Sequence, residues 1–93
     1  MKTVYKYKLN MDGSVELPPD AEILHVNHQD GEPYIWALVD KDAKPGVERR
    51  IRVYGTGHDI PDNPGRYINT FFAGCFVWHV FEDFFRIIEV KRA

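Results

Sequence analysis

The chain has 93 residues, of which 44% are hydrophobic and 14% aromatic, and its formal net charge is -2. This length predicts one domain, residues 1–93, with a single core, and the hydrophobic fraction argues against disorder. The negative charge excludes the global basic field that favours duplex nucleic acid.

Nothing in the sequence predicts export or membrane insertion. The segment after Met1 contains Lys2, Lys6 and Lys8 and lacks the apolar centre of a signal peptide. The longest apolar stretches fall far short of the roughly 20 residues of a membrane span. Cys75 is the only cysteine, which excludes an intramolecular disulfide and fits a reducing compartment. We therefore expect a cytoplasmic protein.

The first third of the chain is typical of short strands joined by tight turns. Residues 4–9 alternate between apolar and lysine side chains, as in a half-buried strand. Asp12-Gly13 is a hairpin turn signal, after which residues 15–17 continue with period two. Residues 23–28 form a third strand-like segment, and a turn at Asp30-Gly31 connects it to the next strand.

The middle of the chain contains the most buried strand and the most irregular loop. Residues 34–39 are apolar on both faces, which predicts a central strand, and residues 48–54 alternate again. The stretch from Gly55 to Arg66 then holds three glycines, two prolines and several Asp or Asn turn formers. Such a composition is incompatible with a regular strand or helix.

The last third predicts a hairpin and one undecided element. Residues 67–72 and 76–81 flank Ala73-Gly74-Cys75. Residues 84–90 are rich in apolar side chains, and their pattern fits either a last strand or a short helix. Turn signals at intervals of about ten residues predict an all-β fold, a small antiparallel sandwich or barrel.

Short motifs along most of the chain carry a resemblance to a known family. They are MKTVYKY (1–7), WALVD (36–40), YGTGH (54–58) with IP (60–61), PGRY (64–67) with TF (70–71), and FVWHVFE (76–82). With these motifs the chain resembles a family of small phage and prophage proteins known as a domain of unknown function. The resemblance implies a fold and an origin, a phage accessory protein made in a bacterial host, and no activity.

The Gly/Pro loop is the first candidate for a binding site. Gly55-Thr56-Gly57 offers backbone N–H groups that could hold a phosphate, and His58 lies beside them. Arg66 could bind the same anion through its guanidinium fork, and Tyr54 or Tyr67 could stack on a base. The alternative is a structural connection in which the loop satisfies its own backbone.

A basic stripe next to this loop extends the candidate surface. Arg50 and Arg52 point to the same side of their strand as Tyr54, because side chains alternate. This positive, aromatic face could take a nucleotide or an acidic protein. Alternatively, the arginines protect an exposed edge strand by their charge.

The remaining reactive side chains do not predict catalysis or metal binding. His58, Asp59 and Asp62 lack a recognised ligand spacing, even if His79 and Glu82 approach them in space. We expect His79 to be a hydrogen-bonded structural histidine. Cys75 is expected to be a small packed thiol without a base in reach. We expect no enzyme, no cofactor and no metal.

These observations favour a non-catalytic accessory protein that binds a small phosphorylated ligand, such as a host nucleotide immune signal, and sequesters it. The alternative is a protein–protein interaction module, which inhibits a host defence enzyme or is a minor virion component. The number of aromatic residues exceeds the needs of one small core, which favours a homo-oligomer.

Overall fold

A computed structural model describes residues 1–83, which form seven strands and no helix. The strands are β1 (Lys2–Lys8), β2 (Ser14–Leu17), β3 (Glu22–Gln29), β4 (Glu32–Asp40), β5 (Val47–Gly55), β6 (Arg66–Ala73) and β7 (Phe76–Glu82). The all-β prediction is confirmed, and each predicted strand up to Phe81 is present. The undecided element at 84–90 lies outside the described residues.

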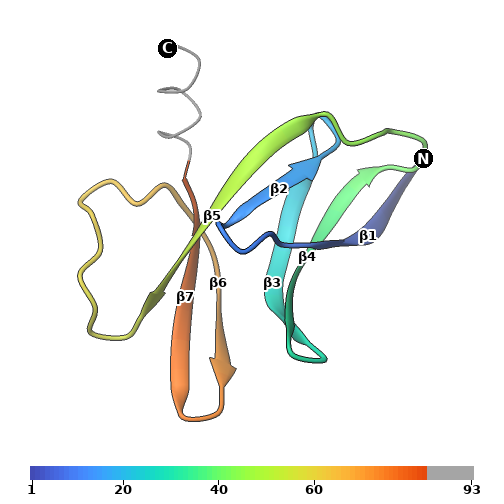
Figure 1. The fold of residues 1–93 in the computed structure, drawn as a ribbon. Coiled ribbons are helices and arrows are strands. Elements are labelled where there is room, and N and C mark those ends of the chain that lie inside the picture. Colours follow the sequence, from blue (N-terminus) through green and yellow to red (C-terminus); the bar gives the residue numbers. More distant parts are fainter. Residues whose placement is uncertain (84–93) are drawn as a thin grey trace.

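Two antiparallel sheets pack face to face as a small sandwich (Figure 1). One sheet has the order β1-β4-β3, and the other has the order β2-β5-β7-β6. The strand predicted to be central, β4, lies between β1 and β3. Asp30 and Gly31 join β3 to β4 with φ angles of 55° and 81°, the backbone that a two-residue hairpin turn requires.

The core lies between the sheets and is built from alternate residues of the strands. Ile35, Ala37 and Val39 of β4 are almost completely buried, and they face Ile51 of β5 and Val80 of β7. Intervening residues point outward, as the period of two demands. The faces predicted for β5 therefore hold, with Ile51 inward and Arg52 outward.

An asparagine side chain joins the two sheets along one edge. The Asn69 side-chain oxygen accepts a hydrogen bond from the Val26 amide at 2.8 Å, and its nitrogen donates to the Val26 carbonyl at 3.0 Å. The register of β6 shifts between Tyr67 and Asn69, a bulge that turns this side chain toward β3. The amide thus replaces one step of a strand ladder where β3 and β6 meet.

Candidate functional site

The start of the Gly/Pro loop is a closed turn. The His58 amide donates to the Gly55 carbonyl at 3.0 Å, and Gly57 between them has a φ of 87°. The Thr56 amide donates to the Val77 carbonyl at 3.2 Å. Of the three amides predicted to hold a phosphate, that of Thr56 is therefore hydrogen-bonded within the protein, as is the neighbouring His58 amide.

The His58 ring covers the backbone of Gly55. A Cβ atom built on Gly55 would lie 2.8 Å from Cε1 of His58. A larger residue at position 55 would displace the exposed His58 ring from this position. This arrangement agrees with the structural interpretation of the turn.

Arg66 is directed to a buried carboxylate, away from the turn. The Glu82 side chain is completely buried at the end of β7, and Arg66 Nη2 lies 3.3 Å from its Oε1. Arg49 donates to the same carboxylate through Nε and Nη2, and through Nη1 to the Ala21 carbonyl at 3.0 Å. Burial of an unpaired carboxylate is costly, and the positive charges of Arg49 and Arg66 offset that cost.

The outward side chains of β5, β6 and β7 form a continuous surface. Phe81 lies between two tyrosine rings in edge-on contact, with centroids 5.9 Å from Tyr54 and 5.5 Å from Tyr67. Arg52 pairs with Phe81 in the β5–β7 ladder, and Phe72 extends the surface along β6. We call these five residues, Arg52, Tyr54, Tyr67, Phe72 and Phe81, the outer aromatic face.

A chain of polar contacts crosses the same side of the sheet. Nε2 of His79 lies 2.7 Å from the Thr56 hydroxyl, and Nδ1 lies 3.0 Å from the Thr70 hydroxyl. The Thr70 hydroxyl is in turn 2.7 Å from the hydroxyl of Tyr67. Both ring nitrogens are thus engaged, which confirms the prediction of a hydrogen-bonded histidine. The chain also ties the turn at Thr56 to the outer aromatic face.

The two arginines of the basic stripe have acidic neighbours. Arg50 lies 3.2 Å from Glu48 and 4.0 Å from Asp12, and Arg52 lies 3.5 Å from Asp83. Hydrogen bonds from the Ser14 hydroxyl and amide lower the pKa of Asp12, which keeps this carboxylate charged. The stripe is therefore a set of local ion pairs, with a weaker positive field than the sequence predicts.

The predicted binding residues thus separate into three groups. Arg50, Arg52, Tyr54, Thr56 and Tyr67 lie on or beside one face of the sheet, in agreement with strand alternation. Gly55, Gly57 and His58 form the closed turn. Arg66 lies apart from both, on the buried carboxylate of Glu82.

A cavity of about 470 Å³ on the inner side of the same sheet was not predicted. Its walls include Leu9, Met11, Val53, Phe71 and Trp78, and we call it the inner cleft. It forms because β2 has only four residues and leaves the second half of β5 uncovered on that edge. Because Ser14, the first residue of β2, pairs with Arg50, the Asp12-Gly13 turn before β2 was the available signal in the sequence.

Other kinds of site find no support in the part of the chain that the structure describes. Between Met1 and Asp83, no group of three His, Cys, Asp or Glu side chains is placed to hold a metal ion. No helix in this range is long and apolar enough to cross a membrane. Cys75 is exposed at the tip of the β6–β7 hairpin, so the prediction of a packed thiol was wrong.

Comparison with known proteins identifies the family. Residues 1–86 match the family described as a domain of unknown function (DUF7352), and the chain belongs to this family. No match was found among curated proteins or among solved structures.

Proposed function

We propose that this protein is a non-catalytic binding protein that attaches to a partner protein through the outer aromatic face. The observation that carries the proposal is the convergence of three aromatic rings from β5, β6 and β7 beside Arg52. Tyrosine, phenylalanine and arginine are enriched at the centres of protein interfaces.

The exposure of this surface favours a macromolecular partner. Tyr67 is 54% exposed and Phe72 is 75% exposed. A small molecule is usually held in a concave site that buries most of its surface. These two side chains stand out into solvent, so a broad partner surface covers them better than a small ligand.

Binding of a nucleotide-type ligand is the second candidate function. The exposed ring of Tyr67 provides a face on which a base could stack, and Arg52 lies across β7 from it, where a phosphate could bind. This candidate site omits Arg66, which contacts Glu82, and the Thr56 and His58 amides, which donate hydrogen bonds to backbone carbonyls. It retains the sequestration of a host nucleotide signal as the biological role.

The resemblance to small phage proteins motivates the choice of partner. We infer that the protein acts in the cytoplasm of a bacterial host, on a host defence enzyme or as a minor virion component. The outer aromatic face supplies what such a role needs, an accessible apolar centre next to a guanidinium group.

Affinity capture from a bacterial host lysate tests the proposal. Wild-type protein is compared with Tyr67→Ser and with Tyr5→Ser, which removes an exposed tyrosine from the other sheet. We expect the wild-type and Tyr5→Ser proteins to retain the same host protein and Tyr67→Ser to lose it. Retention by all three proteins would show that the outer aromatic face is not the binding surface.

A thermal-shift panel of linear and cyclic nucleotides separates the two candidates. A ligand at 100 times its dissociation constant stabilises the folded state by about 2.7 kcal/mol. For a domain of this size, each kcal/mol raises the melting temperature by about 4–8 °C. A shift of this size that Tyr67→Ser abolishes would establish the nucleotide candidate in place of the protein partner.

A further inference from the structure

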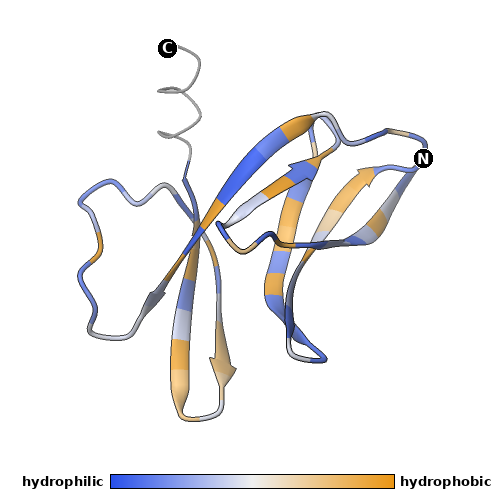
Figure 2. Ribbon diagram, in the orientation of Figure 1, coloured by the Kyte–Doolittle hydropathy of each residue, from blue (hydrophilic) through white to orange (hydrophobic). Residues whose placement is uncertain are grey.

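The β6–β7 hairpin presents apolar side chains that nothing covers within residues 1–83. Its tip projects beyond the β3–β4 hairpin, and both of its strands are apolar there (Figures 1 and 2). Phe76 is 60% exposed and stacks on Trp78, with ring centroids 5.8 Å apart. Phe76 and Trp78 share the inner face with Val80, because side chains alternate along β7.

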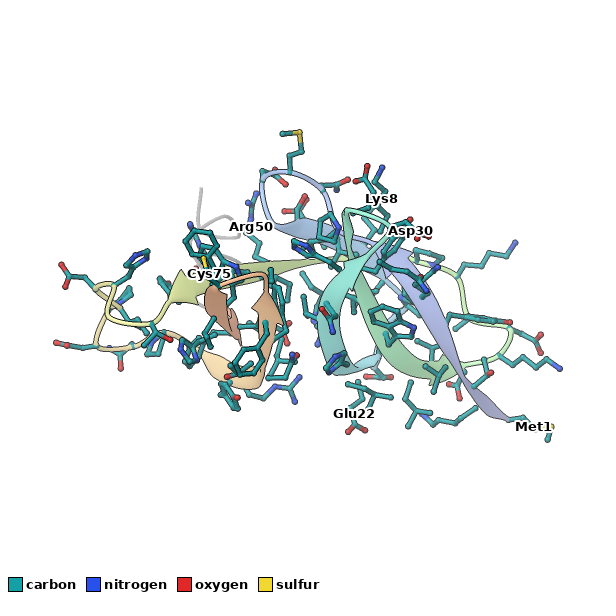
Figure 3. The ribbon with its side chains drawn as sticks, turned by 90° about the horizontal axis from the view of Figure 1, so that it is seen from below. Met1, Lys8, Glu22, Asp30, Arg50 and Cys75 are labelled. Carbon is teal, nitrogen blue, oxygen red and sulfur yellow. The ribbon has the colours of Figure 1, made fainter. Side chains whose placement is uncertain are left out.

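The inner cleft continues this uncovered surface. Trp78 and Phe71, which pair across the hairpin, form one wall of the cleft, and Val53 and Met11 lie on other sides. Viewed from below, the Cys75 turn and the Asp30 turn lie on opposite sides of the molecule (Figure 3). The structure thus combines a projecting apolar hairpin with a concave apolar surface beside it.

The open edge of β5 adds backbone groups to the cleft. The Ile51 amide donates to Gly13 at 2.8 Å, on the edge where β2 pairs. Val53 points its amide and carbonyl to the same edge, because these groups alternate along an antiparallel strand. Within residues 1–83, β2 pairs only with residues 47–50 of β5, so no strand of this range covers Val53.

The charges around the cleft permit a second copy of the chain to approach. The Asp12 carboxylate lies 4.0 Å from the Arg50 guanidinium, and the Arg52 guanidinium lies 3.5 Å from Asp83. Two identical surfaces that meet across a two-fold axis place like groups near one another, which is unfavourable for unpaired charges. Here both charges already have partners, so the apolar contact dominates.

We propose that this protein forms a two-fold dimer in which the β6–β7 hairpin of each copy covers the inner cleft of the other. Phe76 of one copy packs against the cleft walls of its partner, and the reverse contact follows by symmetry. The two reciprocal contacts are both made within one dimer, and they leave the outer aromatic faces free. The dimer is therefore independent of the proposed binding function.

The arrangement predicts which thiols a crosslinker can join. Cys75 lies at the hairpin tip, and the fully exposed Met11 lies at the cleft. In the reciprocal dimer, Cys75 of one copy reaches position 11 of the other, whereas the two Cys75 residues are far apart. A short bismaleimide is therefore expected to give a covalent dimer with the Met11→Cys variant and none with the wild type.

Sedimentation and crosslinking test the proposal together on the full chain. We expect a wild-type dimer at micromolar concentration, and a dissociation constant raised about 30-fold or more in Phe76→Ser. Val4→Ser, which changes an exposed residue of β1, is the matched control and leaves the dimer intact. Mass spectrometry of the Met11→Cys dimer is expected to find the linkage between positions 11 and 75.

Three results would overturn the proposal. The first is a wild-type protein that stays monomeric at concentrations far above micromolar. The second is a Phe76→Ser protein that dimerises like the wild type. The third is a covalent dimer linked only through two Cys75 residues. Should Phe76→Ser fail to fold, as circular dichroism would reveal, the crosslinking of the folded Met11→Cys variant decides alone. Tyr67 lies on the outer face, so we expect Tyr67→Ser to leave the dimer unchanged, which makes loss of partner binding and loss of the dimer distinguishable.

Discussion

The two arginines on Glu82 are predicted to differ sharply in their contribution to stability. Arg49 has a side chain only 14% exposed, whereas that of Arg66 is 48% exposed, and the carboxylate between them is completely buried. Loss of one partner of a buried ion pair costs about 3–5 kcal/mol, because the remaining charge stays buried. Loss of a solvent-screened partner costs about 0–1 kcal/mol.

Arg49→Met and Arg66→Met are therefore a matched pair. Arg49→Met is expected to lower the free energy of unfolding by about 3 kcal/mol or more, which corresponds to a melting temperature lower by about 12 °C or more. Arg66→Met is expected to lower it by less than about 1 kcal/mol. Urea unfolding followed by circular dichroism measures both. Equal losses in the two variants would refute the reasoning, since they would show that Arg66 holds Glu82 as firmly as Arg49 does.

Three further predictions concern the backbone and the turns. Asn69→Ala is expected to cost about 1–3 kcal/mol, because it leaves the polar groups of Val26 unpaired, and faster hydrogen exchange of that amide would confirm the cause. Gly57→Ala is expected to cost about 1–2 kcal/mol from its positive φ alone, whereas in Gly65→Ala the new Cβ would also overlap a backbone carbonyl; similar urea midpoints would contradict this difference. The pKa of Asp12 is lower in the folded protein than its usual value of 3.8, so the ionised carboxylate stabilises the fold at pH values above 3.8. This contribution is lost as the pH falls through the lower pKa of the folded state. Asp12→Asn should flatten that part of the stability profile, and an unchanged acid slope would exclude the contribution.

Local rules predicted the strands well, because most of the chain obeys them. The hairpin predicted at Asp12-Gly13 was wrong, since β1 and β2 belong to different sheets. Asp30-Gly31 adopts the positive φ angles that its hairpin requires, and the alternation in β5 and β7 assigns inward and outward faces. The placement of Tyr54 and Arg52 on one surface followed from the same alternation. These features depend on residues that are close together in the chain, so the sequence alone predicts them.

The fate of Arg66 and Asn69 depends on pairs far apart in the chain. Glu82 continues the inward phase of Val80, but neither its burial nor its two arginine partners were predicted. The bond between Asn69 and Val26 joins residues 43 positions apart and needs a bulge in β6. The sequence therefore revealed residues suited to bind an anion without revealing which of them the fold itself engages.

The central claim is that the outer aromatic face binds a partner and that Arg66 does not. The most direct test is the dissociation constant of the captured partner for wild type, Tyr67→Ser and Arg66→Met, measured by titration calorimetry. We predict an increase of about 30-fold for Tyr67→Ser, as for a residue central to an interface, and an unchanged value for Arg66→Met. The opposite result, in which Arg66→Met abolishes binding and Tyr67→Ser does not, would contradict the account. It would indicate that the Gly/Pro loop with Arg66 is the binding site.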